Sequence, residues 1–189
     1  MILRLQCANE RGLTNNMNDS QIVWQGKSWS LRINPQTFAN GEVVERAFID
    51  HPGAVVLVPL VETAHGYEIL ILRQYRHALR QTILELPAGT RGWDEDWLIC
   101  AQRELQEETG FRAARFEPLG QFWPAPGVSN ELMSLYLARD LTPDPLPQDI
   151  DEEIEVVSIP LAELVEMAQN GRLQDAKSVV GILRTAAVL

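Results

Sequence analysis

Residues 89–111, GTRGWDEDWLICAQRELQEETGF, decide the fold of this chain. They predict a helix from about Asp94 to Thr109. The acidic residues at its start suit the positive end of a helix dipole. Gly110 stands where a glycine commonly ends a helix in the left-handed conformation. We therefore expect an acidic loop that leads directly into a helix.

The charges of this helix lie in an unfavourable place. On a wheel that advances about 100° per residue, its apolar face carries Trp97, Leu98, Ala101 and Leu105. Glu104 and Glu108 fall on the edge of that face, and burying an ionised carboxylate is costly unless a cation or a metal compensates it. Glu107 points further round, within reach of Arg103. A solvated charged helix is the alternative, but the two core-edge carboxylates favour a hard-metal site of the Mg²⁺ or Mn²⁺ type.

The flanking sequence predicts a mixed α/β sandwich preceded by a small antiparallel β-element. Residues 54–60 and 67–73 are apolar on both faces, as in central strands covered by helices. The sequence also has the hairpin signal Asn40-Gly41. Further strands are expected at 82–86, 132–138 and 154–159, and helices at 161–169 and 175–188. We divide the chain into a leader (1–20), the N-terminal β-element (21–50) and a main domain (51–189).

Composition excludes several functional classes. The chain has 189 residues and a formal net charge of −10, from 16 basic and 26 acidic residues. Lys and Arg do not cluster along the sequence as they do in nucleic-acid-binding proteins, so we expect no nucleic-acid partner. No run approaches the roughly 20 apolar residues of a membrane span. The first 20 residues do not resemble a secretory signal, so we expect a cytoplasmic protein. Cys7 and Cys100 offer neither a disulfide framework nor metal-ligand spacing.

Residues 89–111 resemble the Nudix box, G-x5-E-x7-R-E-U-x-E-E-x-G-U, where U is apolar. Every specified position is filled, in order, by Gly89, Glu95, Arg103, Glu104, Leu105, Glu107, Glu108, Gly110 and Phe111. The flanks narrow the resemblance to the ADP-ribose pyrophosphatase subfamily. Upstream lies LRQYRHALRQTILELPAG (72–89), and downstream Pro126 follows Gly110 by 16 residues. The resemblance covers about residues 20–185 and implies a Nudix α/β/α sandwich.

The resemblance also implies a reaction and its metal ligands. It implies hydrolysis of ADP-ribose, or a related nucleoside diphosphate sugar, to AMP and ribose 5-phosphate with Mg²⁺ as cofactor and Mn²⁺ as the alternative. The metal would be held by the Ala88 carbonyl, Glu104 and Glu108, with Glu107 close by. Arg103 would orient these acids, and Glu95 would hold the loop. The general base would come from the acidic run 151–153, with Glu152 first and Glu153 next.

Substrate contacts follow from the same resemblance. Arg76 would contact the diphosphate, Glu85 would lie in the substrate pocket, and Arg46 and Pro126 would line it. A homodimer is expected, in which the N-terminal β-element completes the partner's site and Trp24 or Trp29 stacks on adenine. Strand packing is the alternative role of each tryptophan.

Three other functions compete with this interpretation. A GDP-mannose pyrophosphatase and a general nucleoside diphosphate sugar hydrolase share much of the pattern. A non-catalytic ADP-ribose sensor would show a degraded box and a DNA-binding segment. This box is complete, and only about 30 residues follow residue 160, so the sensor is disfavoured.

Overall fold

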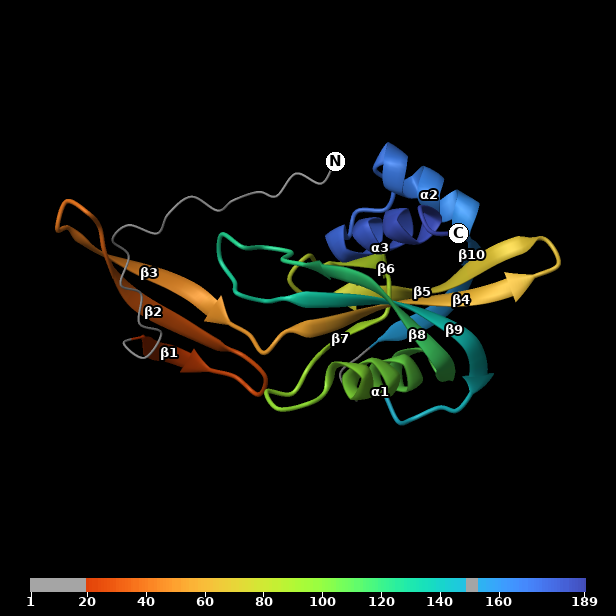
Figure 1. Cartoon of the computed structure of the whole chain (residues 1–189), viewed down its shortest axis with the longest axis horizontal. Coiled ribbons are helices and arrows are strands. Elements are labelled where there is room, and N and C mark those ends of the chain that lie inside the picture. The colour runs from red at the N-terminus through yellow and green to blue at the C-terminus, as the bar shows by residue number, and fades with distance from the viewer. Residues whose placement is uncertain (1–19, 149–152) are drawn as a thin grey trace, which may run out of the picture.

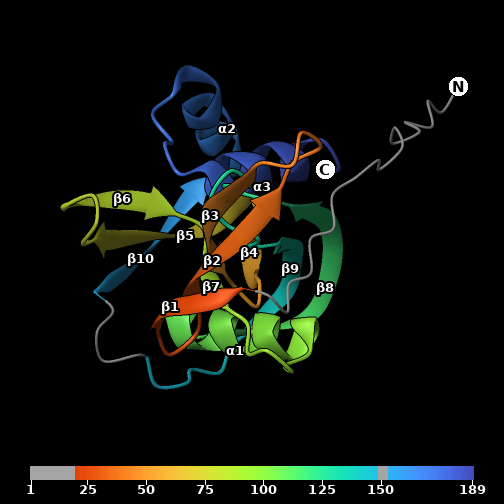
Figure 2. The ribbon, with the colours of Figure 1, turned by 90° about the vertical axis from the view of Figure 1, so that its left-hand side faces the viewer.

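A seven-stranded mixed sheet lies between helices on both faces (Figures 1 and 2), in a computed structural model that describes residues 20–148 and 153–189. Five strands follow the order β10-β5-β4-β9-β8, while β6 pairs with β5 and β7 pairs with β4. The predicted α/β class is confirmed. The strands are β4 (Ala54–Thr63), β5 (Gly66–Arg76), β6 (Gln81–Glu85), β7 (Ala88–Thr90), β8 (Phe111–Phe122), β9 (Met133–Pro143) and β10 (Ile154–Pro160).

Strand β4 divides the core between the two faces of the sheet. Because successive side chains of a strand point to opposite faces, Val55 and Leu57 pack against α1 (Trp97–Thr109), whereas Val56 and Val58 pack on the side of the C-terminal helices. Those helices are α2 (Leu161–Asn170) and α3 (Ala176–Ala186). The prediction of central strands covered on both faces is therefore confirmed. None of the helices in the described residues is long and apolar enough to cross a membrane.

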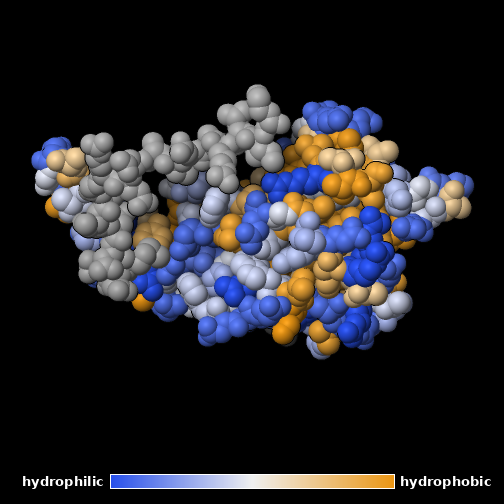
Figure 3. All heavy atoms as spheres, viewed as in Figure 1, coloured by the Kyte–Doolittle hydropathy of each residue, from blue (hydrophilic) through white to orange (hydrophobic). Residues whose placement is uncertain are grey.

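The N-terminal residues form a separate antiparallel sheet of three strands, β1 (Gln21–Gln25), β2 (Ser30–Thr37) and β3 (Val43–Asp50). It extends away from the sandwich in Figure 1. The predicted hairpin at Asn40-Gly41 is formed, since β2 and β3 pair antiparallel on either side of it, and Gly41 has a φ of 85°, a conformation that favours glycine. Trp29 precedes β2 and packs against Trp24 with ring centroids 4.6 Å apart. On the face drawn in Figure 3, polar and apolar side chains are mixed, and apolar ones gather over α2 and α3.

Helix α1 differs from the prediction in two respects. It begins at Trp97 rather than Asp94, because the Asp96 carboxylate caps it by accepting the Leu98 and Ile99 N–H groups at 2.8 and 3.3 Å. The acidic residues therefore precede the helix. Leu98 is 49% exposed and does not belong to the buried face. Ala101 and Leu105 are fully buried, as predicted.

Strand β8 was not predicted. Its sequence, FRAARFEPLGQF, contains Pro118 and Gly120 and does not alternate regularly between apolar and polar residues. The register against β9 shifts between these two residues. An edge strand tolerates proline and an irregular register because one of its sides has no strand to pair with.

Candidate active site

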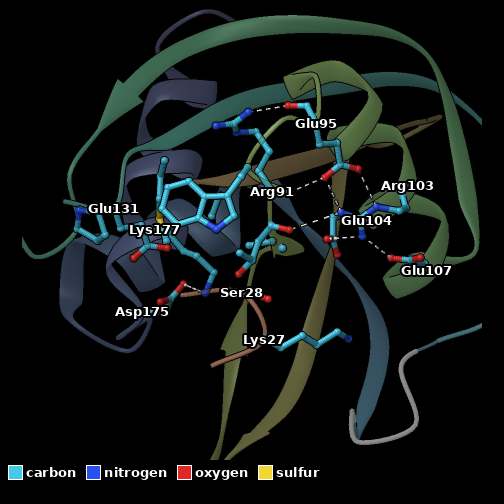
Figure 4. A pocket seen from close by; sticks show the side chains of 18 of the residues that line it. Lys27, Ser28, Arg91, Glu95, Arg103, Glu104, Glu107, Glu131, Asp175 and Lys177 are labelled. Atoms are coloured by element: carbon cyan, nitrogen blue, oxygen red, sulfur yellow. Dashed lines mark hydrogen bonds and ion pairs between the residues drawn. The ribbon is translucent and has the colours of Figure 1, made fainter. Parts of the chain in front are cut away.

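A cavity of about 670 Å³ lies where the loop after β7, the start of α3 and the end of β5 meet (Figure 4). The β1–β2 turn also reaches it through Lys27 and Ser28. Half of the residues that line it are charged, which suits a polar, charged ligand: Lys27, Arg76, Arg91, Glu95, Arg103, Glu104, Glu107, Glu131, Asp175 and Lys177. Ser28, Ala88 and Gly89 are among the uncharged ones.

Arg103 organises the acidic side of the cavity. Its guanidinium donates to both oxygens of Glu95 at 3.0 and 3.1 Å, and to Glu104 and Glu107 at 2.6 and 2.9 Å. Glu95 also accepts the Gly92 N–H at 2.9 Å, which closes the loop before the helix. The hydrogen bond from Arg103 holds the pKa of Glu95 below its usual range. One arginine thus orients three carboxylates of the box.

The carboxylates of Glu104 and Glu108 lie against the backbone of residues 88 and 89. Glu104 is 8% exposed and Glu108 is 2% exposed, which confirms the burial expected from the wheel. Glu108 Oε2 accepts the Ala88 N–H at 2.8 Å. A Cβ atom on Gly89 would lie only 1.8 to 2.2 Å from the Glu104 carboxylate atoms. Position 89 therefore admits only glycine if the carboxylate is to stay in place.

The donor set at this point suits a hard cation that the substrate helps to bind. Within residues 20–148 and 153–189, no group of three or more His, Cys, Asp or Glu side chains is arranged to hold a metal ion on its own. Mg²⁺ usually takes one or two carboxylates and completes its octahedral shell with waters and substrate phosphates. Two buried glutamates, of which Glu108 accepts the backbone N–H of Ala88, match that pattern.

The opposite side of the cavity is built around Glu85. Arg76 donates to it through two hydrogen bonds of 2.6 Å, and Lys177 donates to Oε2. Burial alone would raise the pKa of Glu85, but the Arg76 hydrogen bonds and the Lys177 charge outweigh it and lower the pKa. Glu85 is 2% exposed and lies behind Arg76 rather than in the cavity lining. Both of its oxygens bind cations of the protein, Arg76 and Lys177, and a contact between Glu85 and substrate stays a prediction.

The family model of the NUDIX domain matches residues 50–180. The chain belongs to the NUDIX family. It is 30% identical to the methanol dehydrogenase activator of Bacillus methanolicus, over 86% of this chain and 88% of that protein. It is 29% identical to the ADP-ribose pyrophosphatase of Bacillus subtilis, over 85% of this chain and 86% of that protein.

Two further comparisons bear on specificity and fold. The GDP-mannose pyrophosphatase of Cronobacter sakazakii is 32% identical, over 76% of this chain and 80% of that protein. A crystal structure of an ADP compounds hydrolase superposes with a TM-score of 0.76, covering 97% of this chain and 96% of that chain at 23% identity. The predicted family resemblance and Nudix fold are confirmed, and the protein is a hydrolase of this family.

Several residues that the Nudix resemblance assigned to the site do not line the main cavity. Arg46 and Pro126 line a second cavity of about 390 Å³ beside β2 and β3. Glu153 lines a third, of about 320 Å³, next to Tyr75. Trp24 and Trp29 contact each other and lie outside the main cavity lining. Glu152, the expected base, lies outside the described residues.

The sequence carried no expectation for several other residues that line the main cavity. Lys27 and Lys177 are the only two lysines of the chain, and both line the main cavity. Glu131 lines it as well, and burial raises the pKa of its carboxyl group. Asp175 caps α3, since its carboxylate accepts the Ser178 N–H at 3.1 Å. An Asp directly before a helix is the sequence signal that could have identified this cap. No spacing in the sequence links Lys177 to Glu85, 92 residues earlier.

Proposed function

We propose that the protein hydrolyses the diphosphate linkage of ADP-ribose, or of a related nucleoside diphosphate sugar, with Mg²⁺ as cofactor. One observation carries the proposal. Arg76 lines the same cavity as residues 88–89, against which the carboxylates of Glu104 and Glu108 lie. A diphosphate needs a donor for its anionic oxygens and a means of neutralising its charge. The cavity offers both.

The metal-binding residues in this proposal are the Ala88 carbonyl, Glu104 and Glu108, with Glu107 at the edge. A bound Mg²⁺ would neutralise phosphate oxygens and lower the pKa of a water. Arg103 keeps Glu104 and Glu107 in place by its hydrogen bonds of 2.6 and 2.9 Å. Mn²⁺ is proposed as a substitute because it prefers the same oxygen ligands.

Arg76 is proposed to bind the diphosphate. Its planar guanidinium presents donors in a fork that matches phosphate oxygens. Glu85 occupies Nε and Nη2, and the side chain is 41% exposed. The remaining edge of the guanidinium is therefore available on the cavity side.

A base must take a proton from the attacking water as the P–O bond to the leaving phosphate breaks. We propose that the acidic run 151–153 supplies it, with Glu152 first and Glu153 next. Glu153 precedes Ile154, which pairs with Gln74, two residues before Arg76. The described chain thus enters β10 beside the end of β5 that carries Arg76.

Two matched variants test the choice of base. Glu152→Gln should lower kcat by roughly 100-fold or more, the range for loss of a positioned base, while Glu153→Gln should retain most of it. Initial rates with ADP-ribose under saturating Mg²⁺ would decide. The reverse pattern would assign the base to Glu153.

A hydrolysis panel tests the substrate class. ADP-ribose, GDP-mannose, ADP-glucose, a diadenosine polyphosphate and 8-oxo-dGTP should be compared with and without Mg²⁺, and the products identified by mass. We expect ADP-ribose to give AMP and ribose 5-phosphate with the highest kcat/KM. Preference for GDP-mannose would favour the alternative that the 32% identical relative raises. Turnover of 8-oxo-dGTP alone would contradict the proposal.

The N-terminal sheet supports a homodimer as a second part of the proposal. Apolar side chains lie exposed on it: Ile22, Val23, Trp24, Trp29, Val43 and Val44. We propose that a second copy covers this sheet and that Trp24 or Trp29 stacks on the base of a substrate. Light scattering after gel filtration should give twice the monomer mass, and a monomeric mass would reject it.

A further inference from the structure

We propose that Lys177 is a positioning residue that fixes Arg76, through the buried carboxylate of Glu85, against the diphosphate of the substrate. The inference rests on the proposed function and assigns a role to the C-terminal helix α3. It concerns a lysine for which the sequence patterns carried no expectation. Its basis is the arrangement of four charged side chains from three parts of the chain.

Glu85 is the centre of this arrangement. Its carboxylate is 2% exposed, and burying an ionised carboxylate is unfavourable unless cations compensate it. Arg76 from β5 binds both oxygens at 2.6 Å, and Lys177 from α3 binds Oε2 as well. Without Lys177, the Oε2 atom would retain one cationic donor instead of two. Arg76 would then be oriented by a carboxylate whose buried charge only Arg76 itself compensates, so the position of that carboxylate would be held less firmly.

The start of α3 fixes Lys177 in turn. Asp175 accepts a hydrogen bond from Lys177 Nζ at 2.9 Å and also accepts the Ser178 N–H. Ser178 Oγ donates to Asp175 and accepts the Leu86 N–H at 2.7 Å. Helix α3 is thus joined to the end of β6 at two successive residues, 85 and 86. These two contacts fix the position of the Glu85 carboxylate relative to Arg76.

Exposure separates a positioning role from direct substrate binding. Both cations line the cavity, but the Lys177 side chain is 8% exposed whereas that of Arg76 is 41% exposed. Two carboxylates already bind the Lys177 ammonium group. Arg76 therefore presents the N–H groups that contact the diphosphate, and Lys177 affects substrate binding only by holding Arg76 in place.

A double-mutant cycle in the full-length protein tests this dependence. The variants are Lys177→Met, Arg76→Lys and the double variant, assayed with ADP-ribose and Mg²⁺. Because the diphosphate is already charged in the ground state, Lys177→Met should raise KM by roughly tenfold and change kcat much less. In the Arg76→Lys background, the same substitution should add little, since coupled residues are non-additive. Lys177→Arg should restore most of the loss in KM.

The control is Arg172→Met, which removes an exposed cation paired with Glu166 on the surface. It should leave KM and kcat unchanged. Multiplicative effects of Lys177→Met and Arg76→Lys would overturn the proposal in favour of direct substrate contact. A fall in kcat alone, or no effect of Lys177→Met, would also overturn it.

A measurement without turnover keeps the inference separate from the proposed function. Lysine-specific ¹⁵N labelling gives only two side-chain signals, because the chain has two lysines. The slowly exchanging one should shift in Glu85→Gln. In a second sample labelled with ¹⁵N at arginine, the Arg76 Nε–H signal, assigned by its loss in Arg76→Lys, should exchange faster in Lys177→Met. If Lys177→Met does not fold, Lys177→Gln, which removes the charge but keeps a hydrogen-bond donor for Glu85, takes its place. Unchanged Arg76 exchange would overturn the positioning role, whereas lack of turnover by the wild type would reject only the substrate.

Discussion

The two sides of the cavity hold buried carboxylates in different ways. On the α1 side, one arginine, Arg103, binds three glutamates, and Glu108 adds a fourth carboxylate against the Ala88 N–H. On the α3 side, two cations face two carboxylates around Glu85. The first group carries excess negative charge, whereas the charges of the second balance.

This difference in charge separates two tasks. An excess of carboxylates attracts a divalent cation and disfavours an approaching phosphate unless that cation comes with it. The balanced group holds a guanidinium rigidly while leaving part of it exposed to an anion. A diphosphate lying between the two groups would meet complementary charge on each side. Substitutions on one side should therefore change different kinetic quantities from those on the other.

The largest expected effect comes from Glu108→Gln on the α1 side. The amide oxygen can still accept the Ala88 N–H, so the fold should persist, but the charge for the metal is lost. We expect kcat/KM to fall roughly 1,000-fold, in line with several kcal/mol of lost charge stabilisation.

Glu163→Gln is the matched control, because it makes the same chemical change at an exposed position of α2. It should keep wild-type activity. Thermal unfolding of both variants would check the fold. Full activity of Glu108→Gln with Mg²⁺ would contradict the assignment of Glu108 as a metal ligand.

The two sides also differ in how far the sequence predicts them. Arg103, Glu104 and Glu107 lie within one helix, so helical spacing brings them together and the wheel anticipated their placement. Glu85 and Lys177 lie 92 residues apart and meet only because α3 packs on the sheet at the end of β6. No local periodicity encodes that contact.

The fold shows the same division. The apolar runs of β4 and β5 predict central strands because burial on both faces leaves few polar positions. Edge strand β8, with Pro118 and Gly120, has no such pattern and was missed. The Asp96 cap likewise decided where α1 begins, which the run of acidic residues alone did not reveal.

A smaller effect is expected from Gly89→Ala, which tests how tightly the α1 side is packed. The new Cβ would overlap the Glu104 carboxylate, so the carboxylate or the loop must move. Misplacement of a site group by about 1 Å can cost roughly 100-fold in rate, and we expect kcat/KM to fall by about that factor.

Gly127→Ala is the control for this substitution. No heavy atom lies within 4 Å of a Cβ built at that position, and no positive φ constrains it. Its activity should match the wild type. Equal losses in the two variants would show that a general effect of alanine, rather than contact with Glu104, causes the change.

The smallest effect concerns stability, through Glu95→Gln. The pKa of Glu95 is lower in the folded protein than its ordinary value of 4.5, chiefly because Arg103 donates to it. Its contribution to stability is therefore present above pH 4.5 and is lost as the pH falls through the lower, folded value. We expect the variant to be less stable than the wild type by about 1 kcal/mol at pH 7, the scale of a charge-assisted pair. Urea unfolding at pH 7 and pH 3.5 should show this difference shrinking at the lower pH. A difference that stays constant would mean that Glu95 contributes by packing, and Arg103 would then organise the α1 side through Glu104 and Glu107 alone.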